Sequence, residues 1–356
     1  MTTRRTRAAL ISLLLVAPVA LAGCDGWLLG ADPDPTPAAV FQSLWEEMDR
    51  YYAHFVVKDV DWAATGREFG PLAAAAGTEP ELFTVLCSML ERLQDGHVNL
   101  YAFGDLGSCG YSGWYDRYPR NFEPGLIRDA YLGHDAAVTG DGRLTYGPLA
   151  PGIGYVHVAD FGGEGWIDDV DQVLADLAPL HALIIDVRDN GGGSSRKSDA
   201  LAARITDRPR LNSYVRFRNG PAHHDFTPPA PRIVEPAGPS RFTGPVAVLT
   251  NRRCFSACEG FVLAARVLPH VNIVGDTTGG GLGNPLFREL PNGWSFRAPV
   301  WLQTDPDDRP LEGVGIFPHL PVQLEVGDVV RGRDTILDAA LAELRKDPTV
   351  PSPAPD

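Results

Sequence analysis

Ser256 stands in a segment whose residue types and spacing could support hydrolytic chemistry. Residues 246–259 run from an apolar stretch through a tight turn into an apolar helical pattern, and Ser256 falls where that helix should begin. At such a position, free backbone N–H groups and the positive end of the helix dipole can stabilise a developing oxyanion. Serine at a helix start is also commonly no more than an N-cap. Considered alone, the segment favours the N-cap interpretation.

Two further segments supply a glycine-rich turn and a histidine. Residues 184–193 read as a strand that runs into the turn Asn190 to Gly193, where glycines let backbone N–H groups approach a ligand closely. No Gly-Lys-Ser/Thr follows, so the turn is not a phosphate loop. His97 comes directly after an expected helix and is a candidate general base. A purely structural histidine at a helix end is the competing interpretation.

The apolar spacing along the chain changes near residue 152. Before it, residues 38–52 and 80–93 place apolar side chains at helical spacing, which predicts a small N-terminal helical subdomain over 38–97. After it, β-branched runs alternate with helical patterns, which predicts an α/β core over 98–345 with parallel strand pairings. The expected core strands are 153–158, 182–187, 214–217, 246–250 and 271–274, and the expected core helices are 198–205, 259–267 and 334–345.

Composition excludes some classes of protein. The chain has 356 residues, of which 44% are hydrophobic and 21% charged, so it can bury a sizeable core. A formal charge of −14 argues against nucleic-acid binding, which needs clustered basic residues. Of the 31 basic residues only Lys58, Lys197 and Lys346 are lysine. No CxxC or His-Cys ligand pattern is present, so we expect no metal and no cofactor.

The N-terminus has the features of an export signal. Arginines 4, 5 and 7 precede an apolar run over 8–22, which is short for a membrane span and ends in a Leu-Ala-Gly-Cys sequence similar to a bacterial lipobox. We expect a signal peptide over 1–23, lipidation of Cys24, a flexible tether over 24–37 and a disordered tail over 346–356. The protein would then be anchored to the membrane through Cys24, on the periplasmic or extracellular face of a bacterial cell envelope. The remaining cysteines could pair there, in an order that the sequence does not give: Cys87, Cys109, Cys254 and Cys258.

Five segments together resemble the C-terminal processing (tail-specific) peptidases, serine peptidases that share a core with tricorn protease and interphotoreceptor retinoid-binding protein. The resemblance implies a crotonase-like α/β core with a mixed sheet and helices, beside the small N-terminal helical subdomain. No PDZ domain is evident, because the interval 98–152 is short for one. The matching segments, in the family order, are 95–98, 186–193, 250–259, 274–285 and 312–319.

The resemblance also assigns roles to single residues. Ser256 matches the nucleophile, and the backbone N–H groups of Gly192 and Ala257 match the oxyanion hole. The tail-specific branch activates its serine with a lysine, but Gly281 stands at the matching position. The tricorn-like branch instead uses a histidine and a glutamate. His97 and Glu312 match these two, whereas the serine that precedes the histidine in tricorn is Gly96 here.

These observations predict a serine-type peptidase that hydrolyses peptide bonds of peptide or protein substrates in the cell envelope. The reaction would pass through an acyl-enzyme on Ser256, with His97 as general base. The alternative is a non-catalytic lipoprotein on the same fold that binds an apolar ligand or serves as a scaffold. The sequence gives no oligomeric state.

Overall fold

Three N-terminal helices form the first unit of the fold. The computed structural model describes residues 35–113, 117–118, 121–139 and 141–351. Helices α2 (Pro37–Tyr51) and α4 (Glu79–Glu91) confirm the two expected helices within two residues, and α3 (Trp62–Ala74) is additional. Threonine or aspartate side chains cap all three N-termini. The helices bury a common apolar cluster that includes Leu44, Met48 and Leu86.

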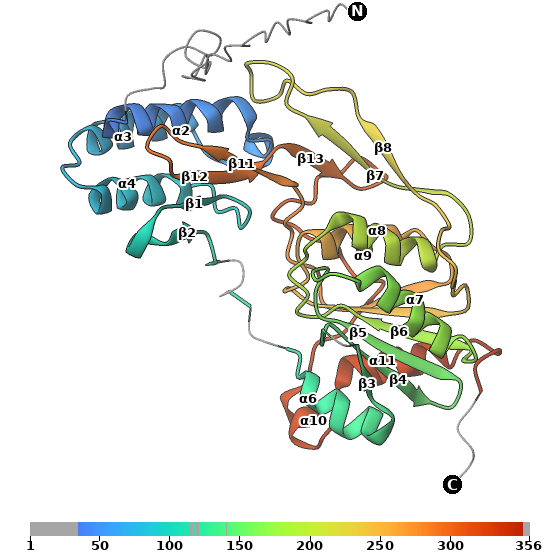
Figure 1. Ribbon diagram of the computed structural model, residues 1–356. Coiled ribbons are helices and arrows are strands. Elements are labelled where there is room, and N and C mark those ends of the chain that lie inside the picture. The colour runs from blue at the N-terminus through green and yellow to red at the C-terminus, as the bar shows by residue number, and fades with distance from the viewer. Residues whose placement is uncertain (1–34, 114–116, 119–120, 140, 352–356) are drawn as a thin grey trace, which may run out of the picture.

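A small antiparallel sheet covers this unit and draws strands from two distant parts of the chain (Figure 1). Its order is β11-β12-β1-β2. Leu100 and Phe296 are buried in the cluster with the helices, while their strand neighbours Asn99 and Arg297 belong to the opposite face. A disulfide between Cys87 and Cys109 ties α4 to β2. The strands are β1 (Asn99–Tyr101), β2 (Ser108–Gly110), β11 (Pro285–Glu289) and β12 (Ser295–Pro299).

The core of the molecule is a mixed sheet, as predicted. It has seven strands in the order β14-β10-β9-β6-β5-β4-β3. The strands from β14 to β5 run parallel, and β4 and β3 are antiparallel additions. Every residue of the central strands β6 and β9 is buried, as expected for a parallel sheet covered on both faces. The strands are β3 (Ala137–Val138), β4 (Leu144–Ala150), β5 (Ile153–Val158), β6 (Ala182–Asp186), β9 (Val246–Thr250), β10 (Val271–Gly275) and β14 (Leu320–Pro321).

Helices cover both faces of this sheet (Figure 1). Helices α7 (Trp166–Leu177), α8 (Ser195–Arg204) and α9 (Ala257–Arg266) pack on one face, and α11 (Thr335–Leu344) packs on the other. Helix α7 is absent from the sequence-based expectations, and the other three confirm expected helices with small shifts of their ends. Val350 is buried against the α11 side, so the chain stays packed beyond residue 345, where the core was expected to end.

A third, three-stranded sheet connects the two units. Its order is β13-β7-β8, formed by β7 (Arg210–Phe217), β8 (Ala230–Val234) and β13 (Trp301–Thr304). In the described part of 98–152, the strands join the other two sheets, and no separate domain is formed. Short helices complete the fold at α6 (Pro124–Leu126), η1 (Phe55–Val57), η2 (Gly104–Leu106), η3 (Ile127–Leu132), η4 (Gly133–Asp135) and α10 (Val326–Val330).

The expected signal peptide, the lipidated Cys24, most of the tether and the last five residues of the tail lie outside the described residues. Among the helices of the described chain, none combines the length and the apolar character that crossing a membrane requires.

Candidate active site

Ser256 lies in the turn between β9 and α9, as the N-cap residue of that helix. Its backbone has φ +60° and ψ −122°, a conformation that non-glycine residues adopt only when their surroundings hold them there, often at functional sites. Its N–H is shared between the carbonyl oxygen of Gly281, at 3.1 Å, and Glu259 Oε2, at 3.2 Å. Neighbouring protein groups thus fix the serine in place.

Glu259 joins helix α9 to the glycine loop that faces Ser256. Its buried carboxylate accepts hydrogen bonds from the Thr278 hydroxyl at 2.6 Å and from the N–H groups of Gly280 and Gly281, each at 2.7 Å. Burial raises the pKa of Glu259 to about 7, against the lowering effect of these donors. Glu259 therefore stabilises the serine turn and the glycine loop through buried hydrogen bonds and is not exposed to substrate.

The glycine turn after β6 meets the serine turn because β6 and β9 are parallel neighbours whose carboxyl ends lie at one edge of the sheet. Gly192 has φ +102°, and a Cβ there would lie 2.7 Å from the carbonyl oxygen of Phe255 and 2.8 Å from Ser256 Cβ. Only glycine allows this approach. The Gly192 N–H, however, donates to Asn190 Oδ1 at 2.8 Å. Gly192 thus lies where the resemblance places it, but its N–H already has a partner.

His97 reaches the site from the loop between α4 and β1. Its backbone N–H donates to Asp95 Oδ1 at 2.8 Å, and its ring packs against Phe255 with centroids 4.6 Å apart. The residue is 3% exposed, and burial lowers its pKa to about 4, so the ring is neutral at pH 7, as a general base must be. Its Nδ1 has no hydrogen-bond partner among the described residues.

Asp95 stabilises the loop that carries His97. Besides the His97 N–H it accepts the Tyr52 hydroxyl at 2.8 Å and His54 Nδ1 at 2.9 Å. The other ring nitrogen of His54 lies 3.1 Å from the Trp301 carbonyl oxygen, so both nitrogens face acceptors and the ring is an imidazolium. Burial would raise the pKa of Asp95, but His54 and Lys58 together hold it below its usual range.

Glu312 lies beside His54 and Lys58, on the side of Asp95. Its Oε1 is 2.9 Å from Lys58 Nζ and its Oε2 is 3.5 Å from His54 Nδ1, in a setting whose burial raises the pKa of the carboxyl group. The resemblance gives Glu312 the role of the glutamate that accompanies the histidine base. Among the described residues, Glu312 is connected to His97 through His54 and Asp95.

Sequence reasoning missed His54 and assigned no role to Lys58. The only local signal for them is their position just after the first amphipathic helix. With Asp95 and Glu312, His54 brings ligand atoms within 4.8 Å of one another, a spacing that could hold a metal ion. Two cationic side chains already balance the two carboxylates, however, so we assign this group as a buried ion-pair network.

The other two lysines lie away from Ser256. Lys197 donates to the backbone carbonyl oxygens of Gly162 and Gly163, and Lys346 forms an exposed ion pair with Glu343. Neither lysine lines the cavity around the serine.

The turn also carries two cysteines. Cys254 and Cys258 are free and buried, and both thiols face the carbonyl oxygen of Val187. They pack the turn and do not line the cavity.

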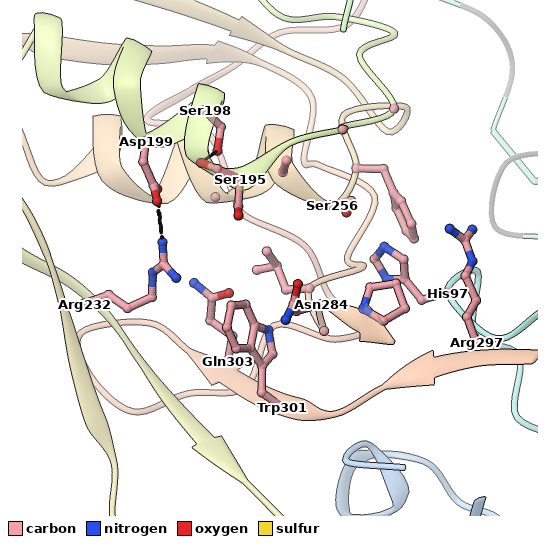
Figure 2. A pocket seen from close by; sticks show the side chains of 18 residues that line it. His97, Ser195, Ser198, Asp199, Arg232, Ser256, Asn284, Arg297, Trp301 and Gln303 are labelled. Atoms are coloured by element: carbon pink, nitrogen blue, oxygen red, sulfur yellow. Dashed lines mark hydrogen bonds and ion pairs between the residues drawn. The ribbon is translucent and has the colours of Figure 1, made fainter. Parts of the chain in front are cut away.

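Ser256 and His97 line one cavity of about 350 Å³ between the two units of the fold (Figure 2). They make no direct hydrogen bond with each other, as is common before substrate binds. Polar and apolar residues both line the cavity, with an ion pair between Asp199 and Arg232 at one end. The other polar side chains are Ser195, Ser198, Asn284, Arg297 and Gln303.

Two family models match the chain. The model of peptidase family S41 matches residues 152–322, and the model of the tricorn protease C1 domain matches residues 33–91. A crystal structure of a candidate peptidase from Parabacteroides merdae is 38% identical, with a TM-score of 0.80, over 90% of this chain and 100% of that chain. The chain belongs to peptidase family S41. It is a serine-type peptidase of the C-terminal processing and tricorn-like group, as the sequence predicted.

More distant structures share the fold. Mature CPAF complexed with lactacystin is 13% identical with a TM-score of 0.63, over 87% of this chain and 97% of that chain. The photosystem II D1 C-terminal processing protease is 15% identical with a TM-score of 0.51, over 82% and 94%. None of the curated proteins compared with the chain matches it.

Proposed function

We propose that this S41 peptidase cleaves peptide bonds through an acyl-enzyme on Ser256, with His97 as general base and then general acid. The Ser256 oxygen attacks the carbonyl carbon while His97 takes its proton. His97 then gives this proton to the leaving nitrogen as the C–N bond breaks. Water activated by His97 attacks the ester, and the proton returns to Ser256 as the acid product leaves.

The observation that carries this proposal is that the strained serine and a neutral, buried histidine line the same cavity. The N–H groups of Ala257, in the first turn of α9, and Gly192 are the proposed oxyanion donors, each worth roughly 3–4 kcal/mol in hydrolases of this kind. The Gly192 N–H must leave Asn190 to take this role. Glu312, His54 and Asp95 act as positioning residues that hold the His97 loop.

A fluorophosphonate probe tests the nucleophile. We expect it to label the purified wild-type protein at Ser256, and Ser256→Ala to lose both the label and the hydrolysis of unfolded casein. Ser195→Ala is the matched control, because Ser195 lines the same cavity and should leave the label in place.

Labelling elsewhere, or hydrolysis that survives Ser256→Ala, refutes the assignment. Absence of both label and hydrolysis in the wild type would favour the alternative, a non-catalytic binder.

The cellular setting of the proposal rests on the N-terminal sequence. Lipidation of Cys24 would hold the enzyme at the bacterial cell envelope, facing the periplasm or the exterior, where it meets peptide or protein substrates. Labelling of expressing cells with a radioactive fatty acid should mark the wild type and not Cys24→Ser. Equal labelling of both proteins would exclude this anchor.

A further inference from the structure

Arg297 lies in the cavity beside the proposed base, and its positive charge has no ion-pair partner among the described residues. It lies in β12, paired with Phe287 of β11 and Asn99 of β1 on the open face of the small sheet. It lines the cavity together with His97, and its charge contributes to lowering the pKa of that histidine. Figure 2 shows Arg297 beyond His97 as seen from Ser256, at the opposite end from Arg232.

Of the three guanidinium nitrogens of Arg297, one has a hydrogen-bond partner among the described residues and two have none. Its Nε donates to Asn99 Oδ1 at 2.6 Å. The Asn99 amide lies over Gly110, where a Cβ would come within 1.9 Å of Asn99 Nδ2, so glycine makes room for this bond. Among the described residues, the two terminal nitrogens of Arg297 make no hydrogen bond or ion pair.

Arg232 shows the contrast within the same cavity. Both carboxylate oxygens of Asp199 lie within 3.1 Å of its Nη2, so its charge is balanced. The charge of Arg297 is therefore the unbalanced one in the lining, in a chain whose formal charge is −14. A preset guanidinium with free terminal N–H groups matches the planar geometry of a carboxylate.

The position of the general acid indicates which part of the substrate would carry this carboxylate. The general acid must reach the nitrogen that leaves, so the leaving segment extends past His97, toward Arg297. Building on the proposed function, we propose that Arg297 is a specificity-determining residue that binds a carboxylate of the substrate just beyond the scissile bond. The carboxylate is either an acidic side chain or the C-terminus of the substrate chain itself.

Four matched peptides test this proposal. Wild-type enzyme first digests unfolded casein, and mass spectrometry of the products defines a good cleavage site. Peptides built on this site carry glutamate or glutamine at the first two positions after the scissile bond, and each ends there in a free carboxylate or an amide. We expect kcat/KM to be roughly tenfold to a hundredfold higher where Arg297 finds its carboxylate. A higher kcat/KM for the glutamate peptides than for the glutamine peptides would show that Arg297 binds an acidic side chain. A higher kcat/KM for the peptides with a free terminal carboxylate than for the amides would show that it binds the chain terminus.

Arg297→Gln should remove this preference mainly through KM, and Arg297→Lys should retain part of it. Arg309→Gln is the control for loss of one charge, because Arg309 is an exposed arginine that pairs with Asp305 and Asp307 outside the cavity. A wild type that cleaves all four peptides equally, or an unchanged preference in Arg297→Gln, overturns the role of Arg297. The role of Arg297 is also overturned if neither the peptides nor casein are cleaved while the fluorophosphonate still labels Ser256. Loss of that label as well would refute the proposed function itself.

Discussion

Phe255 fills the space into which a side chain at Gly281 would project. A Cβ on Gly281 would lie 1.9 Å from Phe255 Cε2 and 2.0 Å from Phe255 Cζ. The same phenylalanine packs against the ring of His97. By the sequence resemblance, Gly281 stands at the position of the catalytic lysine in the tail-specific branch. Phe255 therefore both packs against the histidine and occupies the space that a side chain at that position would need.

Gly281→Lys should therefore not create a serine–lysine pair. We expect the substitution to destabilise the fold by about 1–3 kcal/mol, because Phe255 must move to admit it. Urea unfolding measures this loss, with Gly281→Ala as the smaller change. If Gly281→Lys restored fluorophosphonate labelling to a His97→Gln protein, the closed space would not be the reason why the lysine is absent.

Glu259→Gln should loosen the serine turn. Each carboxylate oxygen of Glu259 accepts from two donors, so an amide group must face two of them and leave buried donors unpaired. We expect a loss of stability of about 2 kcal/mol or more, with slower labelling of Ser256. Chemical denaturation and labelling rates measured at pH 8, where Glu259 is ionised, check both effects. Unchanged values would show that the carboxylate is not needed to hold the turn.

The raised pKa of Glu259 also predicts how stability depends on pH. Between its ordinary pKa of 4.5 and about 7, the folded protein keeps a proton that the unfolded chain releases. The contribution of this group to stability is therefore complete below pH 4.5 and declines as the pH rises through about 7. The unfolding free energy of the wild type minus that of Glu259→Gln should therefore decrease from pH 5 to pH 8. A rise over this interval would contradict the shift.

Burial of His97 predicts an unusually acidic limb in the activity profile. The base loses function when its ring is protonated, so kcat/KM or the labelling rate should fall around pH 4 rather than near 6.5. Circular dichroism across the same range would establish that the protein remains folded. A limb at or above pH 6.5 would argue against His97 as the base in this environment.

The disulfide should stabilise the N-terminal unit. Cys87 and Cys109 are 22 residues apart, and closing a loop of this length stabilises a fold by about 3 kcal/mol in the chain-entropy model. Replacing both cysteines by serine should lower the melting temperature while Ser256 keeps its label. Thiol titration of the unfolded, unreduced wild type should find Cys254 and Cys258 reactive but not this pair. A double variant as stable as the wild type would contradict this contribution.

Local patterns in the sequence predicted the elements that carry the site. The boundaries of β5 and β9 were obtained without error, because both strands are short, mostly buried and rich in β-branched residues. The start of α9 at Ser256 also follows from the chain itself, since the turn and the apolar periodicity meet there. Helix α3 was missed because it contains Gly66, Gly70 and Pro71, so packing against α2 determines it more than helix propensity does.

By itself, then, the sequence determined the order of the elements, the family resemblance and the residues that could act as nucleophile and base. Only the tertiary structure decided what surrounds them. Lys58 and Glu312 are 254 residues apart and His54 and Trp301 are 247 apart, and no local pattern links such pairs. The bond from the Gly192 N–H to Asn190 and the open guanidinium of Arg297 are likewise set by packing. Partners, burial and therefore pKa values depend on which chain segments the fold brings together.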